Sequence, residues 1–194
     1  MTADVQIALP AWLARPETFR RSLLEGAQRA MTNTLVKHFR AKDRAEPNAQ
    51  GWARSHWWNR VASSVTSRIE GESAVADIRE PGVRLRWLGG TVKPKAGKKA
   101  LAIPADPSVR GTWPSEYAGK GGTEKPFPVW QKGAKTGFLA IRGSDPEHPR
   151  IPWWLVGATH HEADPSVVPE TALVEGVAKA AQAVCKALAK GGAA

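Results

Sequence analysis

Apolar residues recur at intervals of three and four near both ends of the chain, which is the stripe of an amphipathic helix. Near the N-terminus the stripe consists of Leu24, Ala27, Met31, Leu35 and Phe39. Near the C-terminus it consists of Leu173, Val177, Ala180, Val184 and Leu188. Pro16 and Glu17 suit the first turn of the first helix. The spacing therefore predicts long helices over residues 16–42 and 168–190.

The segments between these helices predict one shorter helix and several strands. Val61, Val65 and Ile69 recur at helical spacing and predict a second helix over residues 54–69. In the segment 83–88, three apolar residues alternate with two arginines, and the turn dipeptide Pro81-Gly82 precedes it, so a strand is expected there. The predicted strands are 73–78, 83–88, 100–104, 137–141 and 152–156.

Helices at the two ends and strands in the middle predict an α+β fold. We expect a mainly antiparallel sheet packed by a long N-terminal helix and a long C-terminal helix. Residues 1–15 form an N-terminal arm in this prediction, and residues 16–194 form a single α+β domain. The stretches 91–99 and 106–128 are rich in Gly, Pro and charged residues and are expected to be long exposed loops.

The positive charge of the chain is concentrated in its first half. The 194 residues have a net charge of +10, from 28 Lys/Arg and 18 Asp/Glu, and residues 1–100 hold 18 and 9 of these. Such asymmetry is typical of contact with nucleic acid or with an acidic partner. The candidate residues for contact with DNA or a partner are Lys93, Lys95, Lys98 and Lys99. A solvated loop tip is the alternative interpretation of this cluster.

Tryptophan is unusually frequent, with nine residues against four Phe and one Tyr. Trp is enriched at protein interfaces because it buries a large area while its N–H finds a partner. In each adjacent pair we expect one ring to face the core and one to face elsewhere. Stacking on nucleic-acid bases is the competing use. The candidate protein-interface residues are Trp57, Trp58, Trp113, Trp130, Trp153 and Trp154.

No arrangement of residues predicts an enzyme, a metal site or a cofactor. His160 and His161 are adjacent, and neighbouring side chains on an extended segment point to opposite faces, so they chelate one ion poorly. Cys185 is the single cysteine, which excludes an internal disulfide, and its place beside the apolar stripe of the last helix predicts a small buried side chain. Apolar runs stay below the ~18 residues of a membrane span, so no membrane partner is expected.

Several segments, taken in order, resemble the bacteriophage virion-morphogenesis and tail-completion proteins. In the first half these are Phe39-Arg40, Pro47-Asn48, Gly51-Trp52, Arg54, His56-Trp57-Trp58 and Arg60-Val61-Ala62. Further along they are Val83 to Pro94, Leu101 to Ala105, Glu116-Tyr117-Ala118, Trp153 to Val156 and Ala163-Asp164-Pro165. The similarity covers about residues 35–170.

The resemblance implies a structural virion component, a tail-completion or head–tail joining subunit of the phage neck. Such a subunit acts through protein–protein contacts around the DNA channel, in a ring of identical copies for which six-fold symmetry is expected. It implies partners among other neck and tail proteins, possible non-specific contact with packaged DNA, assembly in the host cytoplasm and a final place in the virion. A basic nucleic-acid-binding protein is the alternative function.

Overall fold

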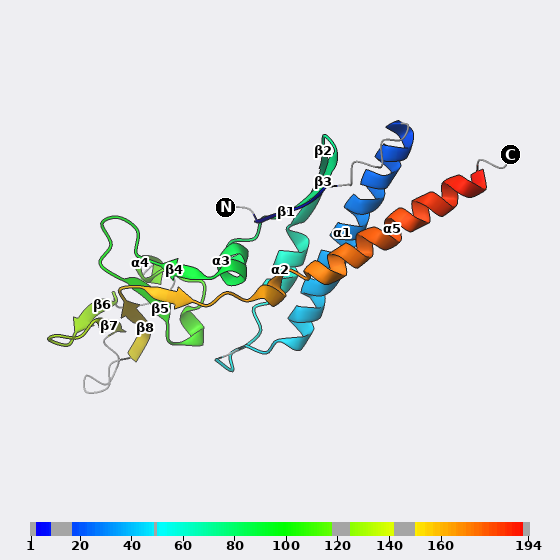
Figure 1. Cartoon of the computed structure of the whole chain (residues 1–194). Coiled ribbons are helices and arrows are strands. Elements are labelled where there is room, and N and C mark those ends of the chain that lie inside the picture. The colour runs from blue at the N-terminus through cyan, green and yellow to red at the C-terminus, as the bar shows by residue number, and fades with distance from the viewer. Residues whose placement is uncertain (1–2, 9–16, 49, 118–124, 142–149, 192–194) are drawn as a thin grey trace. The chain divides into compact units, whose positions relative to one another are not determined.

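The computed structural model describes residues 3–8, 17–48, 50–117, 125–141 and 150–191 (Figure 1). The chain divides into two compact units, whereas the sequence predicts a single domain over residues 16–194. Unit 1 comprises residues 1–89 and 162–194, and unit 2 comprises residues 90–161. Both units combine helices with antiparallel strands, so the predicted α+β class is confirmed.

Two long helices form one side of unit 1, as the apolar stripes predict. They are α1 (Glu17–Ala45) and α5 (Glu170–Gly191), which lie against each other in Figure 1. Leu173 and Val177 of α5 are buried. The two helices approach each other closely at two glycines, which have no side chain. A Cβ at Gly26 would lie 3.3 Å from Val184, and one at Gly176 would lie 2.9 Å from the Thr34 hydroxyl.

A three-stranded antiparallel sheet completes unit 1. Its order is β1 (Ala3–Ala8), β3 (Ser73–Ile78) and β2 (Val65–Glu70), so the predicted strand 73–78 is confirmed as the central strand. The core between this sheet and the helices includes Met31, Leu35, Phe39, Val61, Ala76 and Ile78. Burial of this continuous apolar surface is the main stabilising contribution to the unit.

The predicted helix over 54–69 is wrong in its second half. Helix α2 (Trp57–Ser63) ends at Ser63, and Val65–Glu70 pairs with β3 as a strand. Val65 and Thr66 are β-branched, which favours the extended backbone. The start of α2 is capped from a different helix, because the buried carboxylate of Asp43 in α1 accepts the backbone N–H of Asn59 at 3.2 Å.

The predicted strand 83–88 is also wrong, because Val83–Leu88 is the short helix α3. Gly82 and Gly89 flank it with φ angles of 90° and 70°, values that glycine adopts without strain. The turn at Gly82 starts a helix instead of a hairpin. Val83 and Trp87, four residues apart, then both pack on the core of unit 1.

Unit 2 is built on a four-stranded antiparallel sheet in the order β5-β8-β7-β6. Its strands are β5 (Leu101–Pro104), β6 (Phe127–Trp130), β7 (Thr136–Ile141) and β8 (Arg150–Val156). The predicted strands at 100–104, 137–141 and 152–156 are therefore confirmed. The short strands β4 (Gly90–Val92) and β9 (Thr159–His161) pair separately.

One face of this sheet carries the core of unit 2. Its buried residues are Val109, Leu139, Ile141, Trp153 and Leu155. The 3-10 turn η2 (Pro107–Val109) and the short helix α4 (Pro114–Tyr117) supply Val109 and Tyr117 to this core. The predicted loop 106–128 therefore contributes to the core in its first part, and residues 118–124 lie outside the described residues. The four lysines of the predicted loop 91–99 are all exposed.

Gly137 tests the packing at the edge of this sheet. A Cβ at Gly137 would lie 2.7 Å from the carbonyl oxygen of Val129 and 2.8 Å from the ring of Trp130. We expect Gly137→Ala to lower the free energy of unfolding by about 1–3 kcal/mol, because backbone and ring must both shift. Gly157→Ala is the control, since a Cβ there meets nothing within 4 Å. Urea unfolding of both variants measures the difference, and equal midpoints would contradict this packing.

Candidate functional site

The second face of the sheet in unit 2 is mainly apolar and partly exposed to solvent. The strand register places Ile103, Trp154 and Phe138 side by side on this face. Trp154 is 49% exposed and Phe127 is 38% exposed, while the other large apolar members are half-buried. We call this surface the outer sheet face. Its large apolar residues are Leu101, Ile103, Phe127, Val129, Phe138, Trp154 and Val156, and the register also places exposed Thr136 and buried Ala140 on it.

The outer sheet face arises because β8 is apolar at successive positions instead of alternating. Trp153 and Leu155 point into the core of unit 2, which leaves Trp154 and Val156 on the opposite face. An antiparallel sheet with one solvated face normally shows apolar and polar residues in alternation. The ring of Phe138 meets that of Trp154 edge to face, with centroids 6.3 Å apart. The centre of the outer sheet face is therefore an aromatic pair.

Four lysines lie at one end of the same sheet. Leu101, Val156 and Thr136 are register partners at that end. Lys98 and Lys99 directly precede β5, and Lys132 and Lys135 lie in the connection between β6 and β7. All four are exposed, and among the described residues none of them makes an ion pair. We call Lys98, Lys99, Lys132 and Lys135 the lysine end.

The predicted lysine cluster lies in the connection between β4 and β5, where the backbone N–H of Lys98 donates to the carbonyl oxygen of Lys95 at 2.9 Å. Lys98 and Lys99 belong to the lysine end, beside the outer sheet face. Lys93 and Lys95 follow β4 and are exposed in the connection to β5. Sequence reasoning missed Lys132 and Lys135, because the register of β7 with β8 and β5 brings them to this end.

The six predicted interface tryptophans differ in exposure, with three exposed, two buried and Trp57 half-buried. Trp113, Trp130 and Trp154 are exposed, at 69%, 44% and 49%. Trp58 and Trp153 are buried at 5% and 1%, so both are wrong as interface candidates in this chain. Trp58 stacks on Phe39 and donates its ring N–H to Glu46 at 2.7 Å, and Trp153 packs edge to face on Tyr117.

The first adjacent pair departs from the expected division of roles. Trp57 is half-buried and packs against the same core as Trp58. In the second pair, Trp153 faces the core and Trp154 faces outward, as predicted. A strand separates neighbouring side chains by about half a turn, whereas the short helix α2 keeps both rings near the core.

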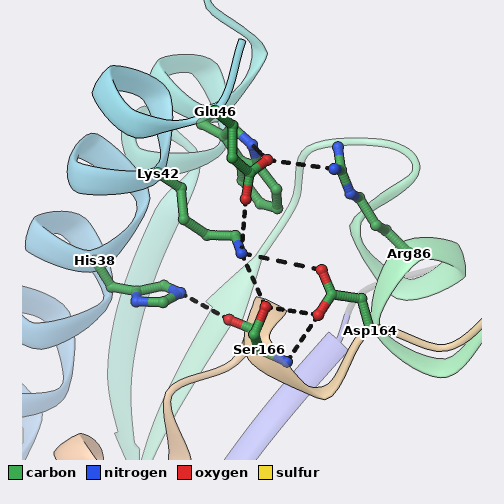
Figure 2. Close-up of polar contacts among 7 residues, drawn as sticks. His38, Lys42, Glu46, Arg86, Asp164 and Ser166 are labelled. Atoms are coloured by element: carbon green, nitrogen blue, oxygen red, sulfur yellow. Dashed lines mark hydrogen bonds and ion pairs between the residues drawn. The ribbon is translucent and has the colours of Figure 1, made fainter. Parts of the chain in front are cut away.

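A charged cluster in unit 1 joins α1 to α3 and to the turn η3 (Pro165–Val167), as Figure 2 shows. At its centre the Lys42 ammonium lies 2.8 Å from Glu46 and 3.9 Å from Asp164, and it donates to the Ser166 hydroxyl at 3.0 Å. Arg86 of α3 reaches Glu46 from the other side at 3.2 Å. The side chains of this cluster satisfy one another.

The pKa values of the two carboxylates follow from these contacts. Hydrogen bonds from Ser166 lower the pKa of Asp164 below its usual value. For Glu46, burial acts to raise the pKa, but hydrogen bonds from Lys42 and Trp58 outweigh it and the pKa is lowered. Both groups stay ionised and paired, so the cluster holds α1, α3 and η3 together and leaves no group free for chemistry.

The same pentapeptide occurs once in each unit, a repeat that the predictions from sequence do not use. Residues 105–109 and 163–167 are both Ala-Asp-Pro-Ser-Val, and each forms a 3-10 turn capped by its aspartate. The valines, Val109 and Val167, are both fully buried at 0%. Each unit therefore contains the same turn, which carries one core residue inward, and direct comparison of the two sequence segments would have revealed it.

Other chemistry-bearing residues do not form a site. His160 and His161 are exposed on β9, and within the described residues no group of three His, Cys, Asp or Glu could hold a metal ion. Cys185 is exposed, which corrects the predicted burial, because it lies beside the stripe that packs on α1. None of the described helices is long and apolar enough to cross a membrane.

The contacts of Asp106 predict how the stability of the fold depends on pH. The backbone N–H of Ser108 and the Arg150 guanidinium lower the pKa of Asp106 from 3.8 to about 2. A lowered pKa in the folded state stabilises the fold above pH 4, by about 2 kcal/mol, and this contribution is lost as the pH falls through 2. We expect Asp106→Asn to lower the free energy of unfolding at pH 7. The variant should also lose less stability than the original chain when the pH falls from 4 to 2.

Glu116→Gln is the control for this substitution, because Glu116 is an exposed carboxylate of the same unit. Urea unfolding at pH 7, 4 and 2 measures the effect. Equal stability of Asp106→Asn and the original chain at pH 7 would contradict the assigned contribution.

Comparison with known proteins returns no relative for this chain. No family model, no curated protein and no solved structure matches it.

Proposed function

We propose that the chain is a structural subunit of a bacteriophage virion, a tail-completion or head–tail joining protein of the neck. It acts in assembly by protein–protein contacts around the DNA channel. The observation that carries the proposal is the outer sheet face, an apolar surface that spans all four strands of the sheet in unit 2. The sequence resemblance supplies the class of assembly.

An exposed apolar sheet face is a binding surface in a soluble subunit. Water contact with apolar side chains is unfavourable, and contiguous exposed apolar patches mark interaction sites. Trp154 and Phe127 are the kind of large aromatic residue that dominates binding energy at interfaces. Covering the outer sheet face with another protein of the assembly would give unit 2 a second apolar layer.

The segments that resemble the phage proteins coincide with contacts that build this fold. Arg54 donates to the carbonyl oxygens of Asp43 and Arg44 at 3.3 and 3.2 Å, which closes the end of α1. Trp58 holds Glu46 in the charged cluster. Leu101 to Pro104 and Trp153 to Val156 pair as β5 and β8 under the outer sheet face. The segments that carry the resemblance are thus segments that this fold uses for structural contacts.

In this function the subunit joins a ring of copies, with six-fold symmetry expected, between neck and tail proteins. Assembly in the host cytoplasm and a final location in the virion belong to the same proposal. The exposed Lys93, Lys95, Lys98 and Lys99 would face packaged DNA or an acidic neighbour. Clustered lysines attract either partner over several ångströms.

Nucleic-acid binding is the second candidate function, favoured by the exposed lysines and the net charge of +10. A salt titration of affinity for duplex DNA separates the two functions. A dedicated binder keeps tight binding at moderate salt, whereas an assembly subunit shows weak binding that salt abolishes.

Substitution of Trp154 tests the proposed function. We expect Trp154→Glu to leave the fold intact, because the side chain is 49% exposed, and to lower the yield of infectious particles at least tenfold. A charge in the outer sheet face would have to be buried on assembly. The measurement is complementation of a phage that lacks the gene, with electron microscopy for unjoined heads and tails.

The matched control is Trp113→Glu, which places the same charge at an exposed tryptophan outside the outer sheet face. Its particle yield is expected to stay within about twofold of the original. Normal infectivity with Trp154→Glu would overturn the role of this face in assembly.

A further inference from the structure

The lysine end adjoins the outer sheet face, and together they define what the face can bind. We infer that the outer sheet face docks a different protein that presents an apolar patch with a cluster of carboxylates at one edge. The apolar patch covers the aromatic pair Phe138 and Trp154, and the carboxylates meet the lysine end. This inference rests on the proposed function and specifies the partner of the same surface.

The size of the outer sheet face shows why the lysines take part. Neighbouring strands lie about 4.8 Å apart, so the four strands span about 14 Å across the sheet. The paired segments are also about 14 Å long, at about 3.4 Å per residue, so the footprint of the face is roughly 200 Å². A stable interface takes about 800 Å² from each partner. The apolar face therefore supplies the centre of a contact, and the surrounding rim includes the lysine end. Interfaces commonly combine an apolar centre with a polar rim.

Charge argues against a second copy of this chain as the occupant. Residues 90–161 contain 11 Lys/Arg and 5 Asp/Glu, a net charge of +6. The remaining residues carry 17 and 13, a net charge of +4. Covering the outer sheet face with either unit of another copy would set the lysine end against a unit of net positive charge, which disfavours a copy as the occupant of this face. A partner with carboxylates neutralises the lysine end instead.

The distribution of charge on the sheet argues against nucleic acid. Surfaces that bind single strands place basic groups along the backbone path between the stacking rings. No strand position of the outer sheet face is charged, and four of its seven large apolar side chains are aliphatic. The lysines lie at one end of the face, which matches a localised anionic cluster better than a continuous line of phosphates.

A labelled peptide tests the inference on the full chain. The probe joins four Leu to four Glu through Gly-Gly, and fluorescence anisotropy measures its binding. Two control peptides replace Glu by Lys or Leu by Ser, and a 20-nucleotide oligo-dT strand tests nucleic acid. We expect the Leu–Glu peptide to bind at least tenfold more tightly than either control peptide and to weaken with added salt.

Variants locate the binding. Trp154→Ser should weaken binding of the Leu–Glu peptide at least tenfold. Trp113→Ser is its control and should leave this binding nearly unchanged. Replacing all four lysines of the lysine end with Glu should also weaken binding of this peptide at least tenfold, whereas Lys179→Glu with Lys186→Glu should change affinity less than threefold. Those two lysines are equally exposed but lie on α5 of unit 1.

Each contrary result overturns the inference. If the Leu–Lys peptide binds as tightly as the Leu–Glu peptide, charge plays no part in binding. If neither peptide binds, the proposed apolar and anionic character of the partner is wrong. Preference for oligo-dT assigns the face to nucleic acid. Sedimentation that detects self-association abolished by Trp154→Ser assigns it to a second copy. Particle yield with Trp154→Glu separately decides the proposed function, because an assembly contact through this face can exist with a partner of other chemistry.

Discussion

Unit 2 has a sheet that is apolar on both faces, and the described part of the unit covers one of them. Val109 and Tyr117, from η2 and α4, close the inner face over Trp153. A sheet with two apolar faces needs a layer on each side to remove them from water. Among the described residues the outer sheet face therefore keeps apolar surface in contact with water, and this is the physical basis for proposing a second molecule as its cover.

In unit 1, by contrast, the charged residues at the end of α1 are paired with neighbours of the same unit. Lys42 is 13% exposed and touches two carboxylates, and Arg86 lies over the ring of Trp58 at 4.8 Å. Such partly buried pairs fix geometry more than they add stability. The lysine end of unit 2 has no such partners among the described residues. The paired charges of unit 1 hold its elements together, and the contrast supports the proposed binding role of the lysine end.

The sequence predicts an element well where its periodicity is long or its apolar run is continuous. The stripe from Leu24 to Phe39 spans several turns, and the strands β7 and β8 are nearly unbroken apolar runs. Short segments fail, because six residues fit either period. Val83 and Trp87 suit a strand by alternation and a helix by their spacing of four, and the backbone at Gly82 and Gly89 decides for the helix.

The site is less predictable than the fold, because it depends on strand register. Trp154 could be identified from the sequence as one member of an adjacent pair, but its exposure follows from the pairing that turns Trp153 inward. Lys98 and Lys135 are 37 positions apart in the chain, and they reach the same end of the sheet because Leu101 and Thr136 are both partners of Val156. A shift of one residue in either pairing would reverse the faces of that strand. The binding chemistry proposed for this chain is thus a property of the assembled sheet, because its residues come together only when the strands pair.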